Sequence, residues 1–176
     1  EFSKVLFNPK PMQKPYPPIW IPGSGSIETW GTCLDKGYLY AYLSYSGYKR
    51  GKQVMDGFWK LATEKGVNNP YHAGFLQLVC IGDNEKHVKE LYAEPVEYFF
   101  NKMLHIYPGF SDAPGYRTMK TIKAGLMAQT TSFGGPAWKK ELTFDDLREA
   151  GNVVAGTPDQ VVSKLREVIK DLRIGH

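Results

Sequence analysis

Apolar and polar positions along this chain alternate between the period of a strand and the period of a helix. A short apolar run at 19–21 follows a proline-rich lead-in, and residues 26–36 then have a helical pattern. The aromatic-rich segment 38–45 lies between Gly37 and Gly47, which favours a strand. Both of its faces are apolar, as is typical of a strand in a parallel sheet.

A second helix and a third strand follow in the same manner. Residues 51–65 carry apolar side chains at helical spacing, and Gly66 supplies the stop. The apolar positions of this helix are Val54, Met55, Phe58, Leu61 and Ala62. The run Phe75–Ile81 then predicts one strand, which Gly82 closes.

The next segment predicts a longer helix that begins at Asp83 or Asn84. Pro95 falls inside it and is expected to kink the helix or split it in two, because proline lacks the backbone donor. One apolar stripe is expected to face the core, made of Val88, Leu91, Tyr92, Val96, Phe99, Phe100 and Met103.

Periodicity fades over residues 106–148, which are rich in Pro, Gly, Ser and Thr. A stretch of this length with little regular structure is uncommon unless it is a functional lid or a mobile loop, so we expect a long loop or lid insertion here. Short helices are expected at 120–127 and 143–149, and Val153 and Val154 form a brief extended piece.

The last helix has the strongest start signal in the chain. Thr157 can cap it, Pro158 suits the first turn, and Gln160 completes a capping box. Its predicted buried face is Val161, Val162, Leu165, Val168, Ile169 and Leu172, and Gly175 is predicted to end it.

This alternation of strands and helices predicts an α/β fold with right-handed crossovers and a parallel sheet. Periodicity leaves two architectures open, an open doubly wound sheet and part of a (β/α) barrel. The chain has 176 residues, 42% of them hydrophobic, which is enough for the core of one domain, so residues 1–176 are expected to form a single domain.

Charge and cysteine content exclude several function classes. The net charge is +4, and the densest basic group, Lys49, Arg50 and Lys52, is typical of a solvated helix start, so we expect no nucleic acid partner. Cys33 and Cys80 lie far apart in apolar surroundings and are expected to be reduced core residues. No segment has the roughly 20 apolar residues that span a bilayer, and the N-terminus does not read as a signal peptide. We therefore expect a soluble, cytoplasmic protein without a membrane partner.

The small residues Gly23, Ser24, Gly25 and Ser26 connect the first strand to the first helix. In both architectures that the periodicity allows, the loops at the carboxyl ends of the strands carry the functional residues. Glycines let the backbone approach a ligand, and the first helical turn offers unpaired N–H groups and the positive end of a dipole, an arrangement that binds phosphate. The alternative is that Ser26 only caps the helix and the glycines only turn the chain. Glu28 weakens the phosphate hypothesis unless its carboxylate points away.

Two separated stretches resemble the bacterial luciferase-like, flavin-dependent monooxygenase family. They are KPMQKPYPPIWIPGSGSIETWGTCLDKGY and VVAGTPDQVVSKLREVIKDLRIGH, and they occur in the family's order. The resemblance implies a TIM-like (β/α)8 barrel, reduced FMN as cosubstrate, O2, and a small organic substrate such as an aldehyde or ketone. It assigns the FMN phosphate to Gly23, Ser24, Gly25 and Ser26 and a flexible lid to 106–148. It also implies a flavin reductase as a partner.

The chain matches only the C-terminal half of such a barrel, since a complete one has at least about 250 residues. The resemblance therefore implies a partial TIM-like barrel with open sheet edges and exposed apolar strand faces, and a homo-oligomer is expected. A non-catalytic flavin-binding or interaction protein built from a shortened barrel is the alternative. The family's catalytic polar groups have no counterpart here, so the catalytic residues are unknown.

The sequence offers few other candidate catalytic or binding residues. The four histidines, His72, His87, His105 and His176, have no metal-ligand spacing, so no metal is expected, and no nucleophile elbow indicates a serine hydrolase. Four tyrosines suit either a strand core or a pocket: Tyr40, Tyr42, Tyr45 and Tyr48. Tyr45 and Tyr48 are the better pocket candidates. Arg50 suits a phosphate contact or an exposed helix start. Tyr116 and Arg117 suit a closing lid or an ordinary loop.

Overall fold

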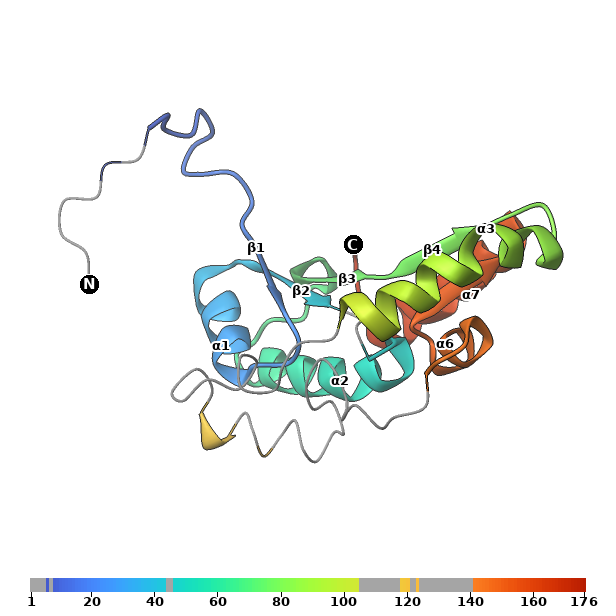
Figure 1. The fold of residues 1–176 in the computed structure, drawn as a ribbon. Helices are drawn as coiled ribbons and strands as arrows, with labels where there is room; N and C mark the ends of the chain where they lie inside the picture. The colour runs from blue at the N-terminus through green and yellow to red at the C-terminus, as the bar shows by residue number, and fades with distance from the viewer. Residues whose placement is uncertain (1–5, 7, 44–45, 105–117, 121–122, 124–140) are drawn as a thin grey trace.

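The computed structural model describes residues 6, 8–43, 46–104, 118–120, 123 and 141–176. Figure 1 shows its elements, which alternate between strands and helices as the sequence predicts. They are β1 (Trp20–Gly23), α1 (Ile27–Lys36), β2 (Leu39–Leu43), α2 (Tyr48–Glu64), a 3-10 turn η1 (Pro70–His72), β3 (Ala73–Leu76), β4 (Leu78–Ile81), α3 (Glu85–Tyr98), a π-helical turn η2 (Phe99–Met103), α6 (Phe144–Ala150), β5 (Val153–Gly156) and α7 (Pro158–Leu172).

The strands form two small sheets, and every pairing in them is parallel. One sheet has the order β1-β2-β3, and the other pairs β4 with β5. In the first sheet Trp20 pairs with Leu39, Tyr40 with Ala73, and Leu43 with Leu76. The predicted α/β class with parallel strands is therefore confirmed.

The predicted single strand 75–81 is wrong, because the chain changes its neighbour at Gln77. Before Gln77, β3 pairs with β2, and after it β4 pairs with β5. The Gln77 side-chain amide donates to the carbonyl of Asn152 at 2.8 Å and to that of Leu78 at 3.1 Å, which occupies the gap between the two pairings. Apolar periodicity could not locate this break, since one apolar run continues through both strands.

The larger core lies between the β1-β2-β3 sheet and the helices α1, α2 and α7. Tyr40 and Tyr42 point into it from β2 and are buried. Tyr42 stacks on Phe75 of β3 with ring centroids 5.6 Å apart. The Trp59 indole N–H of α2 donates to the carbonyl of Leu172 at 2.9 Å, so a buried hydrogen bond ties α7 to α2. Figure 1 shows α1 and α2 together on one side of the sheet.

A second, smaller core joins α3 and α6 to the β4-β5 pair. Its buried residues are Cys80, Val88, Val96, Phe144, Leu147 and Val153. Both Cys80 here and Cys33 in the larger core are free and buried, as predicted. Burial raises the pKa of the Cys80 thiol to about 11, and it also raises the pKa of Cys33. Neither thiol is therefore prepared for nucleophilic chemistry.

Helix termini mostly follow the predicted signals. Ser26 caps α1, Thr143 caps α6, and the Thr157–Gln160 capping box is present at the start of α7. The predicted end of α7 is wrong, since the helix stops at Arg173, which adopts a left-handed conformation with φ 53°. The α2 helix begins at Tyr48, before the predicted start, and α3 runs through Pro95 without being split.

Two predicted buried stripes are wider than the observed ones. Leu91 and Met103 are exposed in the α3–η2 segment, and Val162 and Ile169 are exposed on α7. The reason is that each helix rests on a short sheet of only two or three strands, which covers a narrow stripe. Exposure of the Leu91 region also lets water reach the carbonyl that Pro95 leaves without a donor, which removes much of the cost of a proline inside α3.

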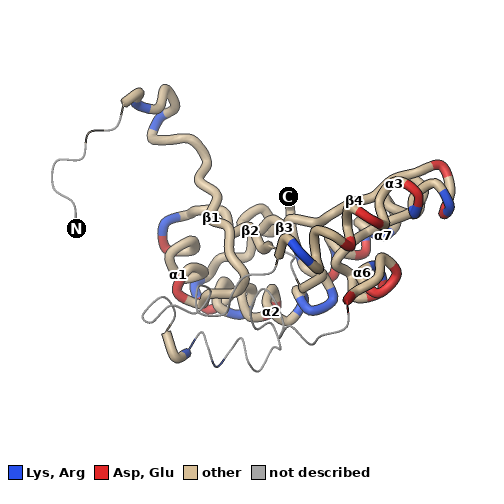
Figure 2. The backbone as a smooth tube through the Cα atoms, viewed as in Figure 1, with Lys and Arg blue, Asp and Glu red and all other residues tan. Residues whose placement is uncertain are grey.

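The predicted helix at 120–127 and most of the predicted lid at 106–148 lie outside the described residues, apart from α6. The single-domain assignment of residues 1–176 stays a prediction. Within the described residues no helix is long and apolar enough to cross a membrane. Lys49, Arg50 and Lys52 are exposed at the start of α2, and Lys52 pairs with Asp56. Figure 2 shows basic and acidic residues interspersed along the helices.

Candidate functional site

The loop Gly23–Ser26 lies where β1 ends and α1 begins. Because β1, β2 and β3 are parallel, their carboxyl ends meet at one edge of the sheet, and this loop belongs to that edge. Ser24 is exposed, while Gly23, Gly25 and Ser26 are half-buried. The structure thus places the four predicted site residues together, at the end of the sheet where parallel α/β folds bind ligands.

Gly23 and Gly25 shape this loop against the core. The Tyr40 hydroxyl donates to the carbonyl of Gly23 at 3.0 Å. Burial raises the pKa of Tyr40 well above its ordinary value, so its phenol stays a donor. Gly25 has φ +123°, and a Cβ there would lie 3.3 Å from the Val54 side chain of α2. The loop conformation is therefore determined by the fold.

Ser26 acts as the N-cap of α1. Its Oγ accepts a hydrogen bond from the Thr29 N–H at 3.4 Å and donates to the Glu28 carboxylate at 3.0 Å. The helix cap that the sequence offers as the alternative role of Ser26 is therefore present in the structure. A cap does not use every donor of the first turn, since a helix starts with four N–H groups that have no partner within the helix.

The Glu28 carboxylate is the feature that works against an anion at this loop. It points toward Ser26 and also accepts a hydrogen bond from Thr118. A carboxylate stabilises the helix dipole in the way a phosphate would, and the two repel each other. The loop fits a phosphate through the α1 N-terminus and the exposed Ser24 hydroxyl once the Glu28 carboxylate, which accepts the Ser26 hydroxyl in this structure, rotates away from Ser26.

The tyrosines predicted as core or pocket residues divide between the two roles. Tyr40 and Tyr42 are buried, and burial raises the pKa of Tyr42 to about 12. Tyr48 lines a cleft, and Tyr45 lies outside the described residues. Arg50 is exposed at the start of α2. The predicted lid residues Tyr116 and Arg117 lie outside the described residues.

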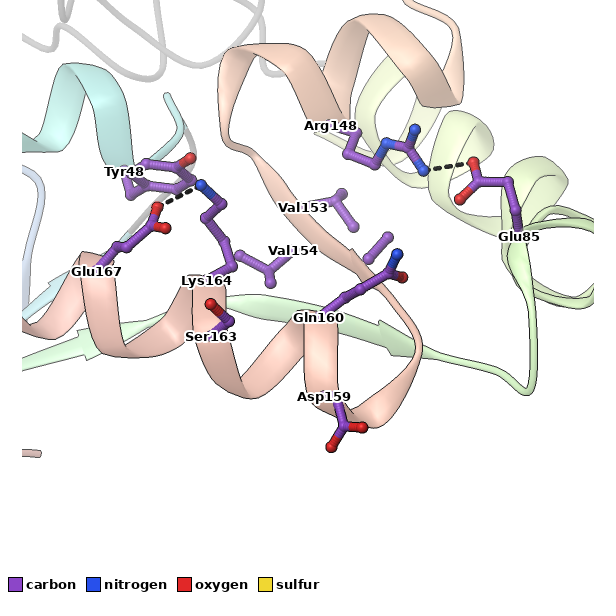
Figure 3. A pocket seen from close by; sticks show the side chains of 11 residues that line it. Tyr48, Glu85, Arg148, Val153, Val154, Asp159, Gln160, Ser163, Lys164 and Glu167 are labelled. Atoms are coloured by element: carbon purple, nitrogen blue, oxygen red, sulfur yellow. Dashed lines mark hydrogen bonds and ion pairs between the residues drawn. The ribbon is translucent and has the colours of Figure 1, made fainter.

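The cleft that Tyr48 lines has a volume of about 590 Å³ and lies along β5 and the first half of α7 (Figure 3). Two ion pairs bound it. Arg148 donates to Glu85 at 2.5 Å, and Lys164 pairs with Glu167, an interaction that raises the pKa of Lys164. Both cations, Arg148 and Lys164, are therefore already paired with carboxylates. The cleft is a weaker candidate for phosphate binding than the Gly23–Ser26 loop. Sequence reasoning missed this cleft because its walls come from five elements that are distant in the chain, α2, α3, α6, β5 and α7.

The described histidines behave as structural or surface residues. His72 immediately precedes β3, at its amino end, and His87 lies 3.2 Å from the Asp83 carboxylate on the surface. The His176 ring packs against Trp20 with centroids 4.8 Å apart. His105 lies outside the described residues. Among the residues described, no cluster of His, Cys, Asp and Glu could hold a metal ion.

Comparison with solved structures finds similar folds. The oxygenating constituent of 3,6-diketocamphane monooxygenase from the CAM plasmid of Pseudomonas putida, a type II Baeyer-Villiger monooxygenase solved in complex with FMN, matches with a TM-score of 0.54 and 18% identity, over 88% of this chain and 38% of that chain. The structure of apo-MsnO8 matches with a TM-score of 0.47 and 17% identity, over 98% of this chain and 47% of that chain. No protein-family model and no curated protein matches.

These similarities concern the fold. The parallel strands and their helices match part of the TIM barrel of luciferase-like monooxygenases, which confirms the predicted partial barrel. The chain spans 38% of the length of the diketocamphane monooxygenase component, so it covers less than half of a complete barrel of that kind. Identity of 18% says nothing about which residues bind or react.

Proposed function

We propose that this chain is the FMN-phosphate-binding part of a flavin-dependent monooxygenase that oxidises a small organic substrate with O2. The observation that carries the proposal is the position of Gly23–Ser26 at the carboxyl edge of a parallel sheet, directly before the first turn of α1. The N-terminus of a helix with an adjoining glycine loop is a ready anion site. The fold similarity to a monooxygenase component solved with FMN supports the choice of anion.

Each residue of the loop has a distinct part in this proposal. Gly23 and Gly25 set the course of the backbone, because Tyr40 and Val54 lie against them. Ser24 is exposed and donates its hydroxyl to a phosphate oxygen. Ser26 keeps the first turn of α1 in place through its bond to the Thr29 N–H, so that the turn's remaining N–H groups face one point.

When bound, reduced FMN supplies the electrons with which O2 is activated for transfer of one oxygen atom to the substrate. A flavin reductase is the partner that would deliver reduced FMN. The part of this chain is to anchor and orient the phosphate end. We assign no residue of the described part of the chain to the reaction with the substrate.

A non-catalytic flavin-binding or interaction protein is the second candidate. It is favoured by one observation, that the match covers only 38% of the monooxygenase component. The two candidates differ in turnover, since only the first consumes O2 when reduced FMN and substrate are present.

The test is a titration of the purified chain with FMN, followed by flavin fluorescence. Ser24→Asp places a carboxylate at the exposed position of the loop and should weaken binding at least about tenfold, which corresponds to about 1.4 kcal/mol of charge repulsion. Ser24→Asn is the matched control, because asparagine has the shape of aspartate without its charge. This variant should bind FMN with nearly the affinity of the parent.

Gly25→Val tests the backbone requirement in the same assay, together with a thermal melt to follow folding. Equal FMN affinity for the Ser24→Asp variant and the parent would place the phosphate elsewhere. No binding by the folded parent would remove the proposed FMN site.

A further inference from the structure

The Tyr40 side chain connects the core to the Gly23–Ser26 loop. Its ring is buried and stacks on Phe58 of α2, with ring centroids 5.2 Å apart. Its hydroxyl donates to the carbonyl of Gly23 at 3.0 Å. A Cβ at residue 23 would lie 3.2 Å from the Tyr40 ring, so glycine permits this close approach. The core therefore holds the ring, and the hydroxyl contacts the loop.

Two N–H groups lie near the Tyr40 oxygen. The Trp30 side chain of α1 is buried, and its indole N–H makes no hydrogen bond to a described residue. Burial raises the pKa of Tyr40, and the indole N–H of Trp30 and the backbone N–H of Gly25 both act on this oxygen in the opposite direction. A hydroxyl oxygen that faces donors has only its own proton to give, and the Gly23 carbonyl is the acceptor for it.

The bond to the Gly23 carbonyl also sets the direction of the next N–H. A planar trans peptide group carries its C=O and its N–H on opposite sides, and the Gly23 carbonyl shares one such group with the Ser24 N–H. Since the carbonyl is directed at the buried Tyr40 hydroxyl, the Ser24 N–H is directed away from the core. Ser24 is exposed, and no described residue accepts a hydrogen bond from its N–H.

This peptide group needs an outside contact to keep its orientation. It follows a glycine, whose backbone dihedral angles are the least restricted of any residue. A flipped peptide would present the Gly23 carbonyl in place of the Ser24 N–H. Because a carbonyl oxygen only accepts hydrogen bonds, it would repel a phosphate that the N–H attracts. The orientation of one peptide group therefore decides whether this position of the loop favours an anion.

We propose that Tyr40 is a positioning residue for the phosphate loop, whose hydrogen bond to the Gly23 carbonyl keeps the Ser24 N–H directed toward the bound phosphate. The inference rests on the proposed function, because it takes the FMN phosphate to lie at this loop. Tyr40 acts through the peptide group and from inside the core. It should therefore affect the binding of the phosphate and leave the contribution of the flavin ring unchanged.

The test compares FMN with riboflavin, which lacks the phosphate, in fluorescence titrations of the full chain. The parent should bind FMN more tightly than riboflavin. Tyr40→Phe removes the hydroxyl and keeps the ring. It should raise the Kd for FMN about three- to tenfold, the range of one lost hydrogen bond, and leave the Kd for riboflavin unchanged.

Tyr42→Phe is the matched control. Tyr42 is a second buried tyrosine of β2, and it stacks on Phe75 of β3 with ring centroids 5.6 Å apart. Its phenylalanine variant loses a hydroxyl from the same core and should bind both flavins as the parent does. A thermal melt of each variant checks that it is folded.

Proton NMR of the parent gives a measurement that needs no variant. A buried hydroxyl that donates to a carbonyl exchanges its proton slowly, so the Tyr40 hydroxyl proton should be visible and should remain visible when FMN is added. The Ser24 amide proton should move downfield on addition of FMN, because it gains a charged acceptor. Riboflavin should not cause this shift.

The outcomes separate this inference from the proposed function. A parent that does not prefer FMN to riboflavin would overturn both. If the parent prefers FMN, equal FMN affinity in Tyr40→Phe and the parent would overturn the inference alone. So would a Tyr40→Phe variant that loses affinity for both flavins equally, or a Ser24 amide proton that FMN does not shift.

Discussion

Glu28 offers the sharpest test of the phosphate site, because its carboxylate accepts the Ser26 hydroxyl that a bound phosphate would also contact. Glu28 accepts the Ser26 hydroxyl at 3.0 Å. A phosphate oxygen at the same hydroxyl would lie about 2.7 Å from it, so the two anions would be at most about 6 Å apart. Replacing Glu28 with Gln removes this charge and keeps the shape of the side chain.

Coulomb's law sets the magnitude. Two unit charges 6 Å apart repel by about 0.7 kcal/mol even at the dielectric constant of bulk water. A phosphate monoester carries a charge of about −1.5 to −2 at neutral pH, so the repulsion is about 1 kcal/mol. We therefore expect Glu28→Gln to bind FMN about fivefold more tightly than the parent, at low salt. The gain should shrink at high ionic strength because salt screens the interaction.

The assay is the fluorescence titration with FMN, repeated with riboflavin, which lacks the phosphate. Riboflavin affinity should not change in Glu28→Gln, since no phosphate is present to be repelled. Glu94→Gln on α3 is the matched control, because Glu94 is exposed and remote from the loop. An unchanged FMN affinity in Glu28→Gln at low salt would refute the placement of the phosphate at Ser24 and Ser26.

Three further predictions concern stability and are measured by chemical unfolding. Ser26→Ala should lower the free energy of unfolding by about 1 kcal/mol, because the Thr29 N–H loses its cap. Trp59→Phe should cost about 1–2 kcal/mol, because the carbonyl of Leu172 loses a buried donor. Burial raises the pKa of Cys80 from 9.0 to about 11, so the unfolded chain loses this thiol proton first; stability is full below pH 9 and should fall by roughly 2–3 kcal/mol between pH 9 and 11. Cys80→Ala should remove that part of the pH dependence and serves as its control.

Local patterns predicted the elements whose signals are complete within a few residues. The capping box of Thr157 and Gln160 and the N-cap Ser26 both depend on side chains that bond to backbone three residues away, so their sequence spacing suffices. The end of α7 differs. Arg173 adopts the left-handed conformation there, and the following Ile174 is buried at 5% exposure, so packing of the last residues, and not a glycine, decides where the helix stops.

Contacts between distant segments could not be predicted from the sequence. Nothing in the run 73–81 shows that β2 is its neighbour up to Leu76 and β5 from Leu78 onward. That division lies at Gln77, whose side-chain amide donates to the carbonyls of Leu78 and Asn152. The cleft beside Tyr48 is likewise lined from distant segments, among them Glu85, Arg148 and Gln160, which explains why its lining residues carry no motif.

The candidate site combines both kinds of information. The order of small residues predicted a bend at Gly23–Ser26, and the structure shows which side each glycine faces. Gly25 turns toward Val54 and Gly23 receives the Tyr40 hydroxyl, so the absence of side chains at both glycines serves contacts within the protein. A loop held in this way keeps its conformation without a ligand, and its first-turn N–H groups are already oriented before an anion arrives. Binding would then require only the displacement of Glu28, which is a rotation of one side chain and not a refolding of the loop.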